Sequence, residues 1–205
     1  MQAFRLALEA GAEMIELDVR RTGDGQLAIL HDHDHAGVAL DSCPLDEFEA
    51  RTGFRPPLLS EVLDWATSRI ALDVELKEDG YANQLIPLLE GFVAAGGELL
   101  VTSFADPLLG HLAQLAPSLR LGLLVEWTAA RVAERAEKVG ARTVLPSMKL
   151  VNERVMNEVT TAGMELIVWD FMAETDAALL ADSRVAGVIT DDVPGALAAR
   201  AASSR

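Results

Sequence analysis

Short aliphatic and β-branched runs alternate with amphipathic segments of helical period along almost the whole chain. This alternation constrains the fold more than any other feature, because a strand–helix–strand repeat requires right-handed crossovers and a parallel sheet. The predicted strands are residues 14–19, 70–77, 99–104, 119–125, 143–147, 165–170 and 186–191. The clearest predicted helices are residues 81–95, 106–116, 129–139, 151–162 and 175–181.

Polar residues gather at the carboxyl ends of several predicted strands. An open doubly wound sheet and a (β/α)8 barrel that lacks one strand both accommodate these strands. The sequence has neither the Gly-rich phosphate loop nor the dinucleotide fingerprint that would favour the open sheet. In a barrel the strand ends converge on one mouth, so the barrel explains all the polar ends together. These ends carry Glu16, Asp18, Glu75, Lys77, Ser103, Trp169, Asp170 and Asp191.

The predicted barrel lacks its first strand. The chain opens in an amphipathic helix at Met1 or Gln2, whereas a barrel begins with a strand, and a final helix over 194–202 follows the last strand. No linker or break in composition divides the sequence. We therefore expect a single-domain α/β TIM barrel over residues 1–205, without the first strand and with two strand edges left unpaired.

The segment TGDGQ after the first predicted strand is too short for a parallel crossover. The chain must return antiparallel here, in a hairpin excursion. The Asp-Gly dipeptide favours a two-residue type I′ turn. With that turn Asp18 lies opposite His31 and Glu16 opposite His33, on one side of the ribbon. A three-residue loop would shift the register and lose both pairs.

Two predicted strands carry the residue types of a site for a hard cation. Glu16 and Asp18 alternate onto one face of the first strand, and Asp73, Glu75 and Lys77 onto one face of the strand LDVELK. Carboxylate oxygens at a barrel mouth suit Mg²⁺ or Ca²⁺. The lysine can hold an anionic substrate oxygen. A neighbouring histidine can act as general acid or base, because imidazole titrates close to neutral pH.

Composition limits the partners and the compartment. The chain is 50% hydrophobic, has a formal net charge of −15 and contains a single cysteine, Cys43. We expect no nucleic-acid partner, because the scattered Lys and Arg form no basic face. We expect no membrane insertion, because no apolar run reaches the ~20 residues of a spanning helix. The lone cysteine fits a reducing compartment, so we expect a cytoplasmic protein unless a signal peptide precedes Met1.

The sequence resembles the glycerophosphodiester phosphodiesterase family along nearly its whole length. The segments that carry the resemblance are FRLALEAGAEMIELDVRRTGDGQLAILHD, PLLSEVL, LDVELK, VTSF, GMELIVWD and GVITDDVP. The order E-x-D, H-D and E-x-K is its most specific feature. The resemblance implies a (β/α)8 barrel and a small-molecule glycerophosphodiester substrate, which is cleaved to an alcohol and glycerol 3-phosphate.

The resemblance also implies roles for single residues. Glu16, Asp18 and Glu75 would bind one divalent cation, Mg²⁺ or Ca²⁺. His31 would be one of two catalytic histidines, and Lys77 would contact the phosphate.

At the other end of the substrate, Trp169 would line the glycerol end. Asp170 follows it, where the family commonly has Thr. The loop after His31 is also short and lacks the Arg-Thr-rich stretch that is usual in the family.

The start of the sequence departs from the family pattern. The family's first strand ends in a His-Arg pair, followed by Gly and a Pro-Glu-Asn stretch, and none of these is present. The resemblance implies that the second catalytic histidine would lie on the strand that the predicted barrel lacks. Either Met1 is an internal methionine and the true start lies upstream, which we favour, or the chain is truncated and catalytically impaired.

Two alternatives stand beside the phosphodiesterase hypothesis. The motif HDH also occurs in amidohydrolase barrels with zinc or nickel, but those need histidines on later strands. Here only His111 follows, inside a predicted helix. The other alternative is a scaffold barrel that keeps the metal ligands without turnover. We interpret His33 and His35 as solvated loop residues.

Overall fold

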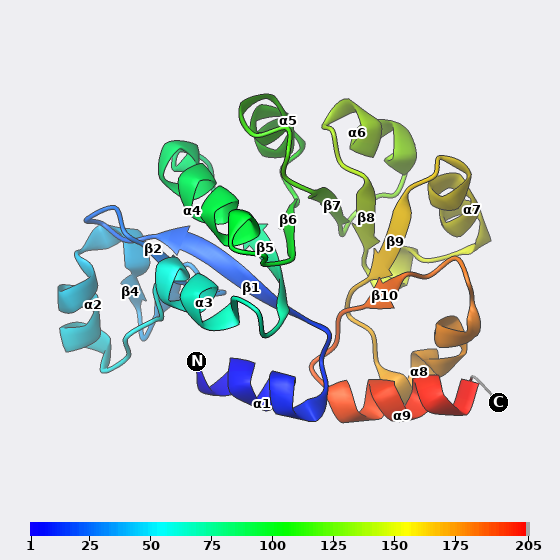
Figure 1. Cartoon of the computed structure of the whole chain (residues 1–205), viewed down its shortest axis with the longest axis horizontal. Coiled ribbons are helices and arrows are strands. Elements are labelled where there is room, and N and C mark those ends of the chain that lie inside the picture. The colour runs from blue at the N-terminus through cyan, green and yellow to red at the C-terminus, as the bar shows by residue number, and fades with distance from the viewer. Residues whose placement is uncertain (204–205) are drawn as a thin grey trace. The chain divides into compact units, whose positions relative to one another are not determined.

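The computed structural model describes residues 1–203, which form two compact units (Figure 1). The first unit comprises Met1–Arg5 and Glu13–Val101, and the second comprises Leu6–Ala12 and the described chain from Thr102 onward. Helix α1 (Gln2–Ala10) and strand β6 (Leu99–Ser103) each contribute residues to both units. A single-domain organisation stays a prediction.

The first unit is built around β1 (Met14–Arg21). Strand β5 (Ala71–Leu76) pairs with β1 in parallel, and β2 (Leu27–Ile29) pairs with its other edge antiparallel. A two-stranded ladder of β3 (Asp34–His35) and β4 (Val38–Ala39) and a 3-10 turn, η1 (Leu40–Ser42), follow β2. The helices of this unit are α2 (Leu45–Thr52), α3 (Leu59–Ala66) and α4 (Ala82–Ala94).

A small apolar cluster anchors the excursion that follows β1. Ala28 of β2 packs there with buried residues of the segment between β4 and α2, and Leu30 and Leu58 cover it. The buried members are Ala28, Val38, Leu40, Cys43 and Phe48. Burial of this cluster holds the segment that contains His31 against the edge of the sheet.

The second unit repeats a parallel strand–helix pattern. Strands β7 (Leu121–Val125), β8 (Thr143–Pro146), β9 (Glu165–Val168) and β10 (Gly187–Val188) follow one another in the sheet. Strands β7 and β8 are buried along their whole length, as expected for a parallel sheet covered by helices. The helical elements are α5 (Asp106–Leu115), α6 (Val132–Lys138), η2 (Met148–Leu150), α7 (Glu153–Thr161), α8 (Ala173–Asp176), η3 (Ala177–Ala181) and α9 (Val193–Ser203).

Most elements predicted from the sequence are present within a few residues of their predicted bounds. The predicted strand over 70–77 is β5, for example, and the predicted helix over 151–162 is α7. The predicted helix over 175–181 is an exception, because these residues form the end of α8 and the 3-10 helix η3. The hairpin excursion after the first strand is confirmed. Helices α2 and α3 and the ladder of β3 and β4 were not predicted individually, because their segments are short and lie between stronger patterns.

The loop of the hairpin has three residues, not the predicted two. The Thr22 N–H donates to the Gln26 carbonyl at 2.9 Å, which closes the loop around Gly23, Asp24 and Gly25. Gly25 has a φ of +86°, as expected for the left-handed position of a three-residue hairpin loop. The Asp24 carboxylate accepts from the Thr22 hydroxyl at 2.5 Å and the Gln26 amide at 2.8 Å, and so stabilises the longer loop.

This loop makes the predicted hairpin register wrong by one residue. Val19 pairs with Ile29, and the Leu30 N–H donates to the Asp18 carbonyl at 3.0 Å. Leu30, not His31, therefore continues the ladder opposite Asp18. A one-residue shift turns each side chain to the other face of a strand, so the ladder itself does not bring His31 to the carboxylates.

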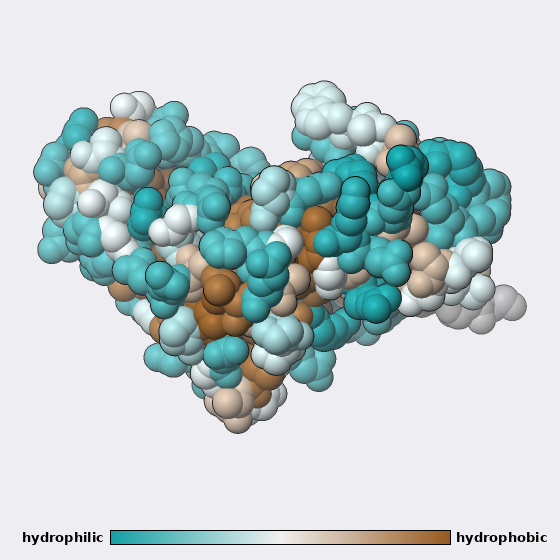
Figure 2. All heavy atoms as spheres, turned by 90° about the horizontal axis from the view of Figure 1, so that it is seen from above, coloured by the Kyte–Doolittle hydropathy of each residue, from teal (hydrophilic) through white to brown (hydrophobic). Residues whose placement is uncertain are grey.

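Hydrophilic side chains predominate on the face of the molecule in Figure 2, with apolar residues in smaller patches between them. Single large apolar side chains are nevertheless exposed, and Trp127, 86% exposed after β7, is the most prominent of them. Within residues 1–203, no helix is both long enough and apolar enough to cross a membrane.

The hairpin loop generates a stability prediction. A Cβ at Gly23 would lie 2.8 Å from the backbone nitrogen and oxygen of Cys43, which cannot move as a side chain can. We expect Gly23→Ala to lower the free energy of unfolding by about 1–3 kcal/mol in urea denaturation, through this overlap.

The matched control is Gly91→Ala in α4. A Cβ there meets no described atom within 4 Å, so alanine raises helix propensity without a clash. We expect this variant to be up to ~1 kcal/mol more stable than the wild type. Equal stability of the two variants would contradict the close packing of Gly23.

Candidate active site

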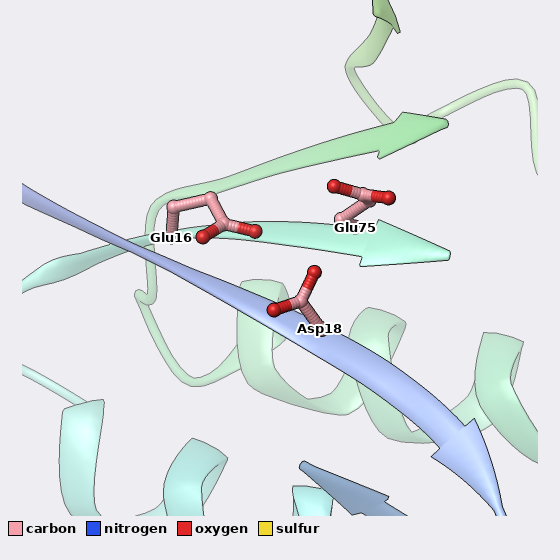
Figure 3. Close-up of side chains that lie close together, drawn as sticks. All are labelled: Glu16, Asp18 and Glu75. Atoms are coloured by element: carbon pink, nitrogen blue, oxygen red, sulfur yellow. The ribbon is translucent and has the colours of Figure 1, made fainter. Parts of the chain in front are cut away.

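The parallel register of β1 and β5 gathers four carboxylates. Glu16 lies beside Asp73, and Asp18 lies beside Glu75. Neighbouring residues of paired strands point to the same side, and alternate residues of one strand share a face. Figure 3 shows Glu16 and Asp18 projecting from β1, and Glu75 from β5, toward a common space.

Three of these side chains are close enough to share one ion. Glu16, Asp18 and Glu75 each offer an oxygen, and these oxygens all lie within 4.8 Å of one another. Asp18 is 8% exposed and Glu75 is 6% exposed. Among the described residues, Glu16 Oε1 and Glu75 Oε1 are buried atoms without a partner in hydrogen-bond geometry. Unpaired buried oxygens are costly, so the cluster is incomplete without a cation or a proton.

Lys77 is the cation that the chain itself supplies to this cluster. Its Nζ lies 2.8 Å from Asp18 Oδ1 and 2.5 Å from Glu75 Oε1. The contact with Glu75 is thus a close ion pair. One lysine leaves the cluster with excess negative charge.

The pKa values of Glu16 and Glu75 reflect both burial and this excess of negative charge. Burial, and then the neighbouring charges of Asp18, Asp73 and Glu75, raise the pKa of Glu16 from 4.5 to about 9, although Lys77 opposes them. Burial also raises the pKa of Glu75, against the opposing effect of Lys77.

The pKa of Lys77 is also raised, but for this group burial opposes the shift. Burial alone would lower the pKa of Lys77, but the hydrogen bonds with Asp18 and Glu75 raise it, so the side chain stays protonated.

This chemistry fits a divalent cation. Three clustered carboxylate oxygens are the hard ligands that Mg²⁺ and Ca²⁺ prefer, and Glu16 also has a buried oxygen without a hydrogen-bond partner. A bound cation would favour the ionised form of Glu16, which burial and like charges disfavour.

His31 lies just beyond the end of β2. Its Nδ1 is 2.8 Å from Asp32 Oδ1, and its side chain is 75% exposed. Its charge lowers the pKa of Glu75, so the two side chains belong to one electrostatic neighbourhood. The predicted pairing with Asp18 across the ladder is wrong, yet His31 still lies near the carboxylate cluster.

Trp169 belongs to the second unit. Its indole Nε1 donates to the Leu145 carbonyl at 2.9 Å, and its ring packs edge-on against Phe104 with centroids 5.6 Å apart. Asp170, the next residue, has a φ of +60°, which redirects the chain after β9. The predicted role of Trp169 at the glycerol end stays a prediction.

Two other residues, one on β1 and one on β5, belong to this neighbourhood, although the sequence motifs assigned them no role. Arg20 donates through Nε and Nη2 to the His31 carbonyl at 3.1 and 2.9 Å. Its spacing from Glu16 and Asp18 on β1 is the signal that could have identified it. Asp73, 2% exposed, lies beside Glu16 and was visible in the alternation of LDVELK.

Residues 1–194 match the model of the "Glycerophosphoryl diester phosphodiesterase family". The chain belongs to the glycerophosphoryl diester phosphodiesterase family. The family resemblance predicted from the motifs is therefore confirmed.

Individual members of the phosphodiesterase family match most of the chain. A glycerophosphodiester phosphodiesterase of Caldanaerobacter subterraneus is 26% identical over 93% of this chain and 86% of its own length. A putative glycerophosphoryl diester phosphodiesterase of Silicibacter pomeroyi superposes with a TM-score of 0.87 at 18% identity, covering 100% of this chain and 88% of its own.

A third relative was solved with its product. The phosphodiesterase of Oleispira antarctica, in complex with sn-glycerol-3-phosphate, has a TM-score of 0.80 at 19% identity over 95% of this chain and 87% of its own. At such identities the structural likeness shows the fold alone. It confirms the predicted α/β fold of TIM-barrel type.

The raised pKa of Glu16 predicts a pH dependence of stability in chelator. The unfolded chain releases this proton near pH 4.5, and the native state retains it to about pH 9. The native state therefore binds more protons within this window, and the free energy of unfolding falls as pH rises, by at most about 1.4 kcal/mol per pH unit.

Glu16→Gln removes this titration. In urea unfolding with EDTA, we expect the variant to lose less stability than the wild type between pH 5 and 9, the window set by the pKa of Glu16. The exposed Glu98→Gln is the control and should follow the wild type. Parallel curves for Glu16→Gln and the wild type would show that Glu16 is ionised in the native state.

Proposed function

We propose that this protein is a metal-dependent phosphodiester hydrolase that cleaves glycerophosphodiesters to an alcohol and glycerol 3-phosphate. The observation that carries the proposal is the carboxylate cluster of Glu16, Asp18 and Glu75, with Lys77 in contact and His31 nearby. Family membership supports it, since relatives bear the name glycerophosphodiester phosphodiesterase. The Oleispira relative, solved with the product sn-glycerol-3-phosphate, supports the same substrate class.

Glu16, Asp18 and Glu75 hold one divalent cation, Mg²⁺ or Ca²⁺, in this proposal. When bound, such a cation neutralises negative charge on the phosphodiester and favours the charge that builds in the transition state. Lys77 supplies a second positive charge beside Asp18 and Glu75, and it orients a non-bridging phosphate oxygen.

His31 transfers the proton. The Asp32 carboxylate, when ionised, is only an acceptor, so Nδ1 of His31 carries the hydrogen between them. This pairing leaves Nε2 to take a proton from the attacking hydroxyl, either the 2-hydroxyl of the substrate or a water, or to protonate the leaving alkoxide. Trp169 lines the glycerol end. The remaining expectations, a cytoplasmic location and no nucleic-acid partner, are unchanged.

A second candidate function is cation binding without turnover. Catalysis in which one group takes a proton and another donates one requires a second acid–base group beside His31. The other histidines of the first unit have local contacts: His33 Nε2 lies 3.7 Å from Asp41, and the His35 ring lies 5.0 Å from that of Phe54. His111 lies on α5 in the second unit. If no other group takes the place of this acid–base partner of His31, the contacts of the described histidines favour cation binding without turnover.

Activity and metal dependence are tested together. We expect glycerol phosphate release from glycerophosphodiesters with Mg²⁺ or Ca²⁺, and none with excess EDTA. Glu75→Gln should weaken Ca²⁺ binding at least about tenfold in isothermal titration, because it removes a charged ligand. Glu98→Gln should bind as the wild type does. Ca²⁺ binding without release of glycerol phosphate would favour the scaffold.

The role of His31 has its own test. His31→Ala should lower kcat by about 100-fold or more, the usual contribution of a general acid or base, and leave Ca²⁺ affinity unchanged. His33→Ala, two residues away and paired with Asp41, is the matched control and should keep wild-type turnover. Wild-type turnover in His31→Ala would remove His31 from the mechanism.

A further inference from the structure

Arg20 makes a two-point contact with the backbone of the proposed catalytic histidine. It follows Glu16 and Asp18 at alternate positions of β1, so it belongs to the same face of the strand. Its Nε and Nη2 both donate to the carbonyl oxygen of His31, at 3.1 and 2.9 Å. The guanidinium is planar and permanently charged, so this pair of bonds fixes direction as well as distance.

The contact lies where the hairpin ladder ends. Strand β2 stops at Ile29, and the Leu30 N–H makes its bond to the Asp18 carbonyl. His31 follows outside any strand, in the segment that leads to the ladder of β3 and β4. In this register Leu30, not His31, lies opposite Asp18, so another contact must set the position of His31.

We infer that Arg20 is a positioning residue that fixes His31 beside the carboxylate cluster. The guanidinium holds the His31 carbonyl, and Asp32 holds Nδ1 of the same residue, so backbone and ring are both constrained. The contact itself rests on geometry. Its consequence for turnover rests on the proposed function of His31.

Arg21 provides a matched comparison. It is the next residue of β1, and alternation turns its side chain away from Arg20. Its N–H donates to Glu78 Oε1 at 2.8 Å, and its Nη1 donates to the Gly80 carbonyl at 3.2 Å. Arg21→Ala removes the same charge from the same strand end while the contact with His31 remains.

The first experiment measures the order of His31 by NMR. In ¹⁵N-labelled protein, Arg20→Ala should lower the heteronuclear NOE of the His31 and Asp32 amides and shift the His31 ring signal. Arg20→Lys keeps a single donor group and should give an intermediate effect. Arg21→Ala should leave these signals as in the wild type. Unchanged His31 signals in Arg20→Ala, or an equal change in Arg21→Ala, would overturn the inference.

The second experiment is a double-mutant cycle on turnover. Arg20→Ala should lower kcat by roughly tenfold or more with KM nearly unchanged, because small displacements of a catalytic group are costly. In the His31→Ala background the same change should have no further effect, since its target is gone. A full additional loss there would overturn the positioning role.

The two proposals fail in different ways. Absence of glycerol phosphate release by the wild-type protein with saturating Mg²⁺ or Ca²⁺ would contradict the proposed function. The NMR comparison of Arg20→Ala with Arg21→Ala would still decide whether Arg20 fixes His31.

Discussion

The parallel pairing of β1 with β5 is the interaction on which the site depends. It places Glu16 beside Asp73 and Asp18 beside Glu75, an arrangement of like charges that is unfavourable by itself. The alternate residues of the same strands are apolar and buried, and their burial stabilises the pairing: Leu17, Val19, Leu72, Val74 and Leu76. Lys77 offsets only part of the repulsion. Burial of the apolar side chains thus keeps the two strands paired, although the carboxylates on their other faces repel one another.

Features that depend on local periodicity could be predicted from the sequence. Alternation along MIELDV and LDVELK gives the shared face of the carboxylates without any knowledge of the fold. The pairing of Asp18 with Glu75 needs a longer step, because residues more than fifty positions apart must be in register. A barrel predicts this pairing, because its strand ends converge on one mouth. In the structure Glu16, Asp18, Glu75 and Lys77 do lie close together.

The position of His31 could not be predicted, since it depends on one residue of loop length. An Asp-Gly dipeptide suits both a two-residue turn and the last two positions of a three-residue loop. Hydrogen bonds of Asp24 with the side chains of Thr22 and Gln26 favour the longer loop. These are contacts between side chains across a turn, and no periodic pattern encodes them. The contact of Arg20 with a backbone carbonyl is likewise invisible in a sequence, because any residue presents that carbonyl.

A divalent cation bound to this cluster would compete with a proton for the same oxygens. Without a cation, Glu16 holds a proton up to about pH 9, which removes one negative charge from a buried group of four carboxylates. A cation that binds Glu16 must displace that proton, so binding and proton release are coupled. The apparent affinity for the cation would therefore rise with pH, up to the pH at which Glu16 loses its proton even when no cation is bound. The same excess of negative charge that would attract a cation would thus also set the pH at which that cation binds fully.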